Sequence, residues 1–188
     1  MTNLMRPDHD VFTQRNNARY PDETCWPTSA VQALHIRDVK MPAGKYEQPE
    51  DNLADFCLRD SRVQQLYKKL DPDRVYHPWQ VHDVLCLAIN AWIGHEVARR
   101  KIFNDGVDLK PILDGGRCIV MSGRFPYYSG RPISHAICIC GYNDEGYIIC
   151  DPWGDYSELY ASGVKCVRDK IMPYADFAVY MGHSCIII

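Results

Sequence analysis

Cys25 occupies a position where a thiol could react. It stands in the segment ETCWPTSAVQAL, whose apolar residues recur at helical spacing, so we expect a helix over residues 26–37. Pro27 suits the first turn of that helix, because its missing N–H would have no partner there. Unpaired N–H groups and the helix dipole at a helix N-terminus favour the thiolate, which is the nucleophilic form of cysteine. The plainer interpretation is a small buried hydrophobe, as most free cysteines are.

A histidine and an aspartate lie at the two ends of a predicted hairpin. His135 opens the apolar run SHAICICGY, and Asp151 closes the run GYIICDP, with the turn-forming residues 143–146 between them. Antiparallel pairing can therefore bring the two side chains together, although they are 16 residues apart in sequence. With Cys25 they have the composition of a nucleophile, a base and a residue that orients the base. Taken singly, each is also an ordinary structural residue.

The rest of the chain must hold these three residues together. Amphipathic patterns predict one or two helices over residues 50–70, another helix opened by Pro78, and a short helix over residues 107–113. From Cys118 onward, short apolar runs alternate with turns and end in the strand-like SCIII. Helices first and strands afterwards predict an α+β fold in a single domain, residues 1–188, with N-terminal helices packed against a C-terminal antiparallel sheet.

Composition narrows the classes of function. The 188-residue chain has a formal net charge of -3, so it lacks the basic patch expected for nucleic-acid binding. No apolar stretch is long enough to span a membrane and the N-terminal residues do not resemble a signal peptide, so we expect a cytoplasmic protein without membrane partners. The oligomeric state stays open.

Nine cysteines raise the questions of disulfides and of metal. Their odd number and the expected cytoplasmic location favour reduced thiols, most of them packed as small hydrophobes. Cys138, Cys140 and Cys150 lie near His135 in sequence, but no Cys-x-x-Cys pair is present. The alternation of Cys138 and Cys140 places them on one face of a strand, which core packing explains. We therefore expect neither a metal nor a cofactor.

Three segments, TCWPTS, SHAICICGYND and IICDPWGDY, resemble the motif blocks of papain-like cysteine peptidases. The resemblance is greatest to the bacteriocin-leader-processing peptidases and their stand-alone relatives in bacteria and phages. It runs from about Thr13 to Tyr160 and is weak over residues 38–110. It implies a papain-like fold with Cys25 as nucleophile, His135 as general base and then acid, and Asp151 as the residue that orients the imidazole.

The resemblance also implies further site residues. Such enzymes usually carry a glutamine about six residues before the nucleophile, where this chain has Arg19. Gln14 is the candidate for the amide that stabilises the oxyanion, and Asn17 is the second. Trp26, directly after Cys25, and Trp153, two residues after Asp151, are candidates for substrate binding. For Trp153, packing at the end of the strand is the alternative.

The implied activity is that of a cysteine hydrolase that cleaves a peptide or amide bond through a thioester. Its substrate would be a peptide or protein. The alternatives are a phage or bacterial endopeptidase or amidase acting on peptidoglycan crosslinks, and a catalytically weak papain-like binding module. Deamidation and acyl transfer also stay open. If the chain is encoded by a phage, the expected location is the host cytoplasm.

Overall fold

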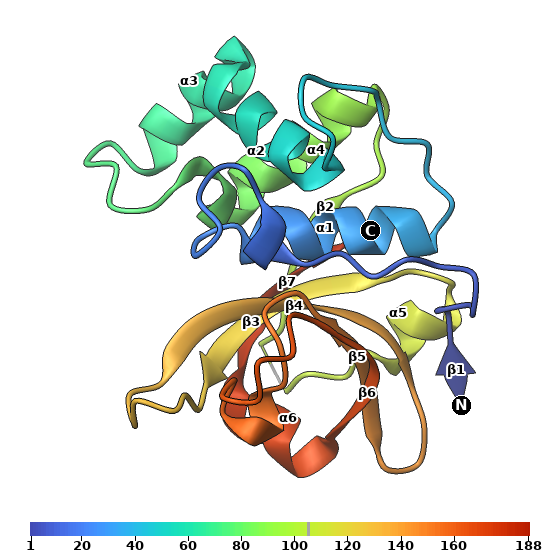
Figure 1. Ribbon diagram of the computed structural model, residues 1–188. Helices are drawn as coiled ribbons and strands as arrows, with labels where there is room; N and C mark the ends of the chain where they lie inside the picture. Colours follow the sequence, from blue (N-terminus) through green and yellow to red (C-terminus); the bar gives the residue numbers. More distant parts are fainter. Residues whose placement is uncertain (105) are drawn as a thin grey trace.

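Helices from the first half of the chain form a layer on one side of an antiparallel sheet (Figure 1). The computed structural model describes residues 1–104 and 106–188. The helix that begins at the predicted nucleophile lies directly against the sheet, and the next helix packs on it from outside. The helices of this layer are α1 (Cys25–Ile36), α2 (Pro49–Arg59), α3 (Ser61–Leu70) and α4 (His82–Ile93).

Over the described residues the sheet has seven strands, and every strand pair in it is antiparallel. The strands are β1 (Thr2–Asn3), β2 (Arg99–Ile102), β3 (Ile119–Phe125), β4 (Ile133–Tyr142), β5 (Gly146–Asp151), β6 (Val167–Pro173) and β7 (Met181–Ile187). Their order is β2-β7-β3-β4-β5-β6, and the short β1 pairs with the end of β4. Two short helices, α5 (Lys110–Asp114) and α6 (Tyr174–Tyr180), lie beside the sheet away from α1 (Figure 1).

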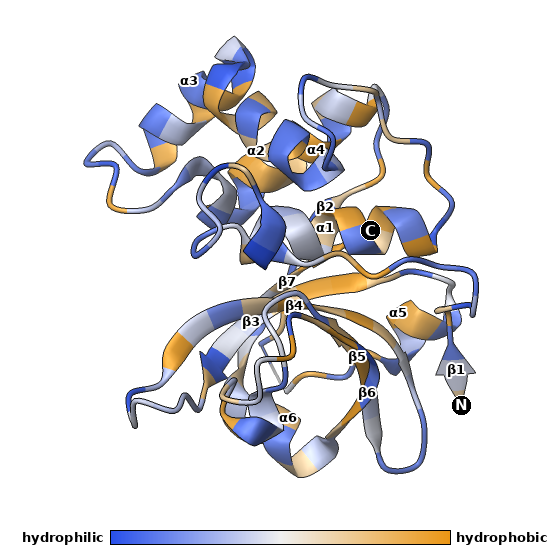
Figure 2. Cartoon of the chain, in the orientation of Figure 1, coloured by the Kyte–Doolittle hydropathy of each residue, from blue (hydrophilic) through white to orange (hydrophobic). Residues whose placement is uncertain are grey.

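Strand β4 is buried on both faces and separates two hydrophobic cores. Ala136, Cys138 and Cys140 pack toward the helical layer, while Ile137 and Ile139 pack into the core on the other face. Figure 2 shows the hydrophobic residues concentrated along these strands between the layers. The prediction that Cys138 and Cys140 share one strand face is confirmed, because side chains alternate along a strand. A strand fixed on both faces is a rigid support for the residues at its end.

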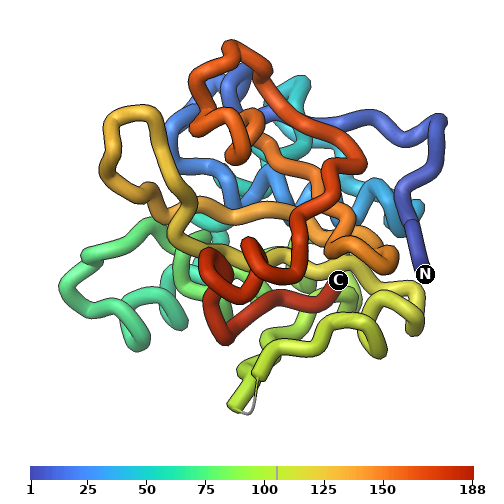
Figure 3. The backbone as a smooth tube through the Cα atoms, turned by 90° about the horizontal axis from the view of Figure 1, so that it is seen from below, coloured from blue at the N-terminus to red at the C-terminus, as the bar shows by residue number. Residues whose placement is uncertain are grey.

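The N-terminal segment runs across the molecule beside α1, as Figures 1 and 3 both show. The N–H of Leu4 donates to the carbonyl of Cys140, at 2.9 Å. Further along, the short 3-10 helix η1 (Gln14–Asn16) begins at Gln14. The N–H of Gln14 donates to the carbonyl of Pro152, at 3.1 Å. These bonds bring Gln14 beside the end of β5, far from it in sequence.

The predicted α+β class is confirmed. Several helix boundaries differ from the prediction, and β1, β2, β6 and α6 were not predicted. Helix α1 begins at Cys25, one residue before the predicted start. The helical stretch over residues 50–70 divides into two helices at Asp60, whose carboxylate caps α3 by accepting from the N–H groups of Arg62 and Val63. The predicted helix over residues 107–113 is shorter and begins at Lys110. Strand β2 was not predicted, because all four of its residues are exposed and show no apolar alternation.

The described residues contain no helix with the length and apolar character needed to cross a bilayer. All nine cysteines are free thiols, and Cys166 is the one that is only half-buried. A further 3-10 helix, η2 (Pro78–Gln80), precedes α4, and η3 (Tyr156–Glu158) follows β5.

Candidate active site

Helix α1 presents Cys25 at its first turn. The preceding residue, Thr24, makes no side-chain cap to the helix and instead donates its hydroxyl to the carbonyl of Tyr20, at 3.0 Å. The first N–H groups of a helix have no intrahelical partner, so they are left open beside the sulfur. Cys25 is 8% exposed, yet it lines an open cleft, so it is covered without being sealed in the core. A thiol in this setting can meet a substrate.

His135 and Asp151 meet where β4 begins and β5 ends. Strand pairing aligns Cys138 with Cys150, which places the two catalytic candidates at the same end of the hairpin. Nε2 of His135 lies 2.7 Å from Oδ1 of Asp151, and both side chains are buried. The turn at the other end is held by Asn143, whose Oδ1 accepts from two backbone N–H groups. Because Nε2 of His135 is bonded to Asp151, the other ring nitrogen, Nδ1, is left to face the thiol of Cys25.

The carboxylate of Asp151 is fixed by two further donors. The N–H of Trp153 donates to Oδ1 at 2.9 Å, and the hydroxyl of Tyr160 donates to Oδ2 at 3.0 Å. The rings of Phe125 and Tyr160 stand edge-on to the imidazole of His135, each at 5.7 Å between centroids. The imidazole thus has a fixed orientation.

The charge state of His135 follows from its two neighbours. Burial alone would lower its pKa, but the carboxylate of Asp151 and the adjacent Cys25 outweigh burial and raise the pKa to about 10. The contribution of Cys25 to this shift, through a hydrogen bond and through charge, places the sulfur next to the ring. An imidazolium in this place is the charge partner that a thiolate nucleophile requires.

Cys25 and His135 open onto a cleft of about 450 Å³. The residues that line it are Gln14, Asp22, Cys25, Tyr127, Ile133, Ser134, His135 and Trp153. The cleft joins the N-terminal segment, the start of α1, the loop before β4 and the loop after β5. A cleft that contains a nucleophile beside an oriented base is suited to acyl transfer.

The two oxyanion candidates are placed differently. Gln14 is 1% exposed and lines the cleft, and its Nε2 donates one N–H to the carbonyl of Pro21, at 2.7 Å. An amide nitrogen carries two hydrogens, so a second N–H is left over. Asn17 does not line the cleft, and its Nδ2 donates to the hydroxyls of Thr24 and Thr28. Of the two amides, only Gln14 faces the place where a substrate would lie.

The two tryptophans also differ. Trp153 lines the cleft, and the guanidinium of Arg15 lies over its ring, 4.6 Å from the centroid. Trp26 is 5% exposed, packs against the ring of His82 at 4.4 Å and is not among the cleft-lining residues.

Sequence reasoning missed Tyr160 and Asp22. Tyr160 belongs to a loop with left-handed backbone, φ 58°, and no motif marks it as a partner of Asp151. Asp22 stands three residues before the nucleophile, and nothing in its local pattern shows that it faces the cleft.

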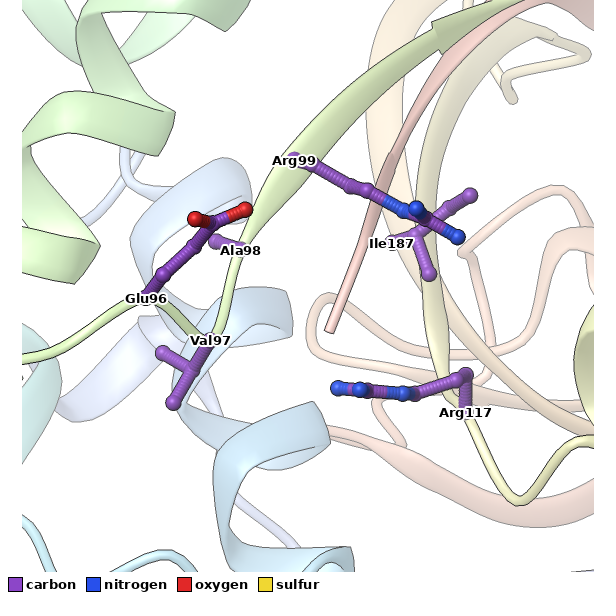
Figure 4. A pocket seen from close by; sticks show the side chains of 6 residues that line it. All are labelled: Glu96, Val97, Ala98, Arg99, Arg117 and Ile187. Carbon is purple, nitrogen blue, oxygen red and sulfur yellow. The ribbon is translucent and has the colours of Figure 1, made fainter.

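The described residues contain no group of three or more His, Cys, Asp or Glu side chains arranged to hold a metal. A second cavity, of about 310 Å³, lies between the segment after α4 and the end of β7 (Figure 4). Figure 4 shows Arg99 and Arg117 at its edge, with no thiol or imidazole among the residues that line it. It shares no lining residue with the cleft at Cys25.

Comparison with known proteins reveals a shared fold and no close relative in sequence. No protein-family model matches the chain, and no curated protein matches it. A crystal structure from Bacillus anthracis, described as a "putative C39-like peptidase", superposes with a TM-score of 0.53 at 15% sequence identity. The match covers 96% of this chain and 94% of the other. At this identity the likeness shows that the two chains have the same α+β fold.

Proposed function

We propose that this protein is a cysteine hydrolase that cleaves a peptide or amide bond, with Cys25, His135 and Asp151 as its catalytic residues. The observation that carries the proposal is the buried His135–Asp151 hydrogen bond of 2.7 Å beside a thiol that opens onto a cleft. The fold shared with a protein described as C39-like supports it.

In the proposed reaction, the proton of Cys25 is held on Nδ1 of His135, and the sulfur attacks the carbonyl carbon of the substrate as a thiolate. The carbonyl oxygen becomes an oxyanion, which the free N–H of Gln14 and the open N–H groups of α1 can stabilise. His135 then gives its proton to the leaving amine, and a thioester with Cys25 remains.

Water completes the cycle. His135 removes a proton from a water molecule, which attacks the thioester carbon, and the thiol leaves with the returned proton. Asp151 keeps the ring in one orientation through both halves, because its carboxylate is itself held by Trp153 and Tyr160. The products are a free amine and a carboxylic acid.

The test compares the wild-type protein with Cys25→Ala and Cys166→Ala. Each is incubated with a peptide library and with purified cell-wall sacculi, and the products are identified by mass spectrometry. Cys25→Ala should lower turnover by on the order of 10⁴-fold or more, since the covalent step is lost. Cys166 is the half-buried cysteine outside the site, so Cys166→Ala should keep turnover. Undiminished cleavage by Cys25→Ala contradicts the proposal.

Thiol labelling distinguishes an enzyme from a binding module built on the same fold. A nucleophilic Cys25 should react with iodoacetamide near neutral pH faster than Cys166, although Cys166 is more exposed. If Cys166 is alkylated faster than Cys25, as exposure alone would predict, the result argues for a binding module.

A further inference from the structure

Asp22 is exposed at the cleft and its side chain pairs with no other residue that the structure describes. It lines the cleft with Cys25 and His135, and none of the ion pairs or side-chain hydrogen bonds among the described residues involves it. The neighbouring acid, Glu23, is paired with His77. Because Asp151 already orients His135, the Asp22 carboxylate has no place in the triad. It is free to meet a ligand.

The backbone around Asp22 is held firmly. The carbonyl of Pro21 accepts from Nε2 of Gln14 at 2.7 Å, and the N–H of Glu23 donates to the carbonyl of Tyr20 at 2.9 Å. The carbonyl of Glu23 accepts from the indole N–H of Trp79, also at 2.9 Å. The backbone that carries the carboxylate is therefore held beside the cleft before any ligand arrives, which reduces the entropy lost on binding.

The other walls of the cleft supply apolar surface. Tyr127, Ile133 and Trp153 line it, and Asp22 is the one acidic side chain among its lining residues. Of the two nearby cations, the imidazolium of His135 is already paired with Asp151, and Arg15 lies over the ring of Trp153 and is not a lining residue. Lysine and arginine combine an apolar stem with a charged end, so such a side chain can pack on the aromatic wall while its charge meets Asp22.

We propose that the cleft selects substrates with a cationic group close to the bond that is cut, and that Asp22 binds this group. The group is a Lys or Arg side chain or a free α-amino group, which share a positively charged nitrogen donor. This inference rests on the proposed function, since it names the class of substrate for the same site.

The test measures kcat/KM for matched peptides that carry Lys, Arg, norleucine or Glu at one position, moved across both sides of the cleaved bond. Wild-type protein should prefer the cationic peptide over the norleucine peptide by about tenfold at one position, as expected for a hydrogen-bonded ion pair. Asp22→Asn should bring that ratio close to one, and Asp22→Lys should shift the preference toward Glu. Peptides with free and acetylated N-termini separate an α-amino group from a side chain.

Asp144→Asn is the matched control. Asp144 is exposed in the turn at the far end of the β4–β5 hairpin, and the substitution makes the same change in net charge. It should leave the selectivity ratio at the wild-type value.

The outcomes separate the two proposals. Cleavage with equal rates for cationic and neutral peptides, or an Asp144→Asn effect as large as that of Asp22→Asn, overturns the inference alone. Cleavage of no peptide, together with slow alkylation of Cys25, overturns the proposed function and this inference with it.

Discussion

Two histidines of this protein are largely removed from solvent, and their pKa values are shifted in opposite directions. His135 lies beside Asp151, and its pKa is raised to about 10. His82, the first residue of α4, lies against the ring of Trp26, with Nδ1 2.9 Å from the hydroxyl of Ser184. Burial lowers its pKa to about 4. Each ring has an aromatic neighbour and a hydrogen-bond partner that orients it, Asp151 for His135 and Ser184 for His82.

The difference between the two sites is the charge of that partner. Burial disfavours the charged imidazolium in both, and only a buried anion reverses the effect. A serine hydroxyl orients His82 without adding charge. Arg100, which lowers its pKa further, outweighs the smaller opposing effect of Asp83. Burial and orientation alone therefore give a structural histidine, and the added carboxylate gives one that can hold and release a proton.

Removing the carboxylate should make His135 resemble His82, and it should have the largest effect of the changes that test this comparison. Asp151→Ala leaves the buried imidazole without its anion and its orienting bond, so kcat/KM should fall by on the order of 10⁴-fold. Asp151→Asn keeps an acceptor for the ring and loses the charge, so its loss should be smaller. In both variants the pKa of His135 should fall below its ordinary 6.5, because burial then dominates.

The measurement is a pH–rate profile together with an NMR titration of the His135 ring. Melting temperatures show whether each variant is folded. An unchanged pKa of His135 in folded Asp151→Asn contradicts the assignment of the charge effect to this carboxylate.

The features of the site that depend on neighbouring residues could be predicted from the sequence. Apolar runs and turn residues predicted the hairpin that joins His135 to Asp151, because strand alternation and turn chemistry are properties of neighbouring residues. Cys25 could be placed at a helix start for the same reason. The triad itself was predicted as a hypothesis from three separated segments.

The other contacts at the two histidines depend on packing between segments that are distant in sequence, so the sequence did not predict them. Nothing near Tyr160 or Ser184 indicates that one donates to Asp151 and the other meets His82, 102 residues earlier. The sequence put Gln14 before Asn17 as the oxyanion candidate, but it did not show which amide reaches the cleft. They are separated only by the loop path, which turns one amide into the cleft and the other toward α1.

The second prediction is about His82 and the change of the unfolding free energy with pH. Its folded pKa of about 4 lies below the ordinary 6.5, so the unfolded chain takes up a proton first as the pH falls. The stability contributed by neutral His82 is complete above pH 6.5 and is lost as the pH falls toward 4. His82→Gln keeps a polar partner for Ser184 without titrating. It should reduce the loss of unfolding free energy between about pH 7.5 and pH 4.5 by about 1–2 kcal/mol.

Urea unfolding at several pH values measures this difference, with His95→Gln, a change at an exposed histidine, as control. His135 should show the opposite sign, since stability from its raised pKa is complete below 6.5 and is lost as the pH rises through about 10. Parallel pH curves for His82→Gln and wild type would mean that His82 is solvated in solution.

The smallest effect should come from Tyr160, the third donor to the carboxylate of Asp151. Tyr160→Phe keeps the ring that stands edge-on to His135 and removes the hydroxyl that donates to Oδ2 of Asp151 at 3.0 Å. A carboxylate with one donor fewer is held less firmly, so kcat/KM should fall about threefold to tenfold. Its charge is also less compensated, so the pKa of His135 should rise further, opposite to the shift in Asp151→Asn.

The control is Tyr156→Phe. It removes a similar hydroxyl, which donates to Asp176 at 3.2 Å, and it should change neither kcat/KM nor the pKa of His135. Equal effects of the two variants would show that Tyr160 contributes packing alone, because only a hydroxyl bonded to the triad carboxylate can reach the charge of His135.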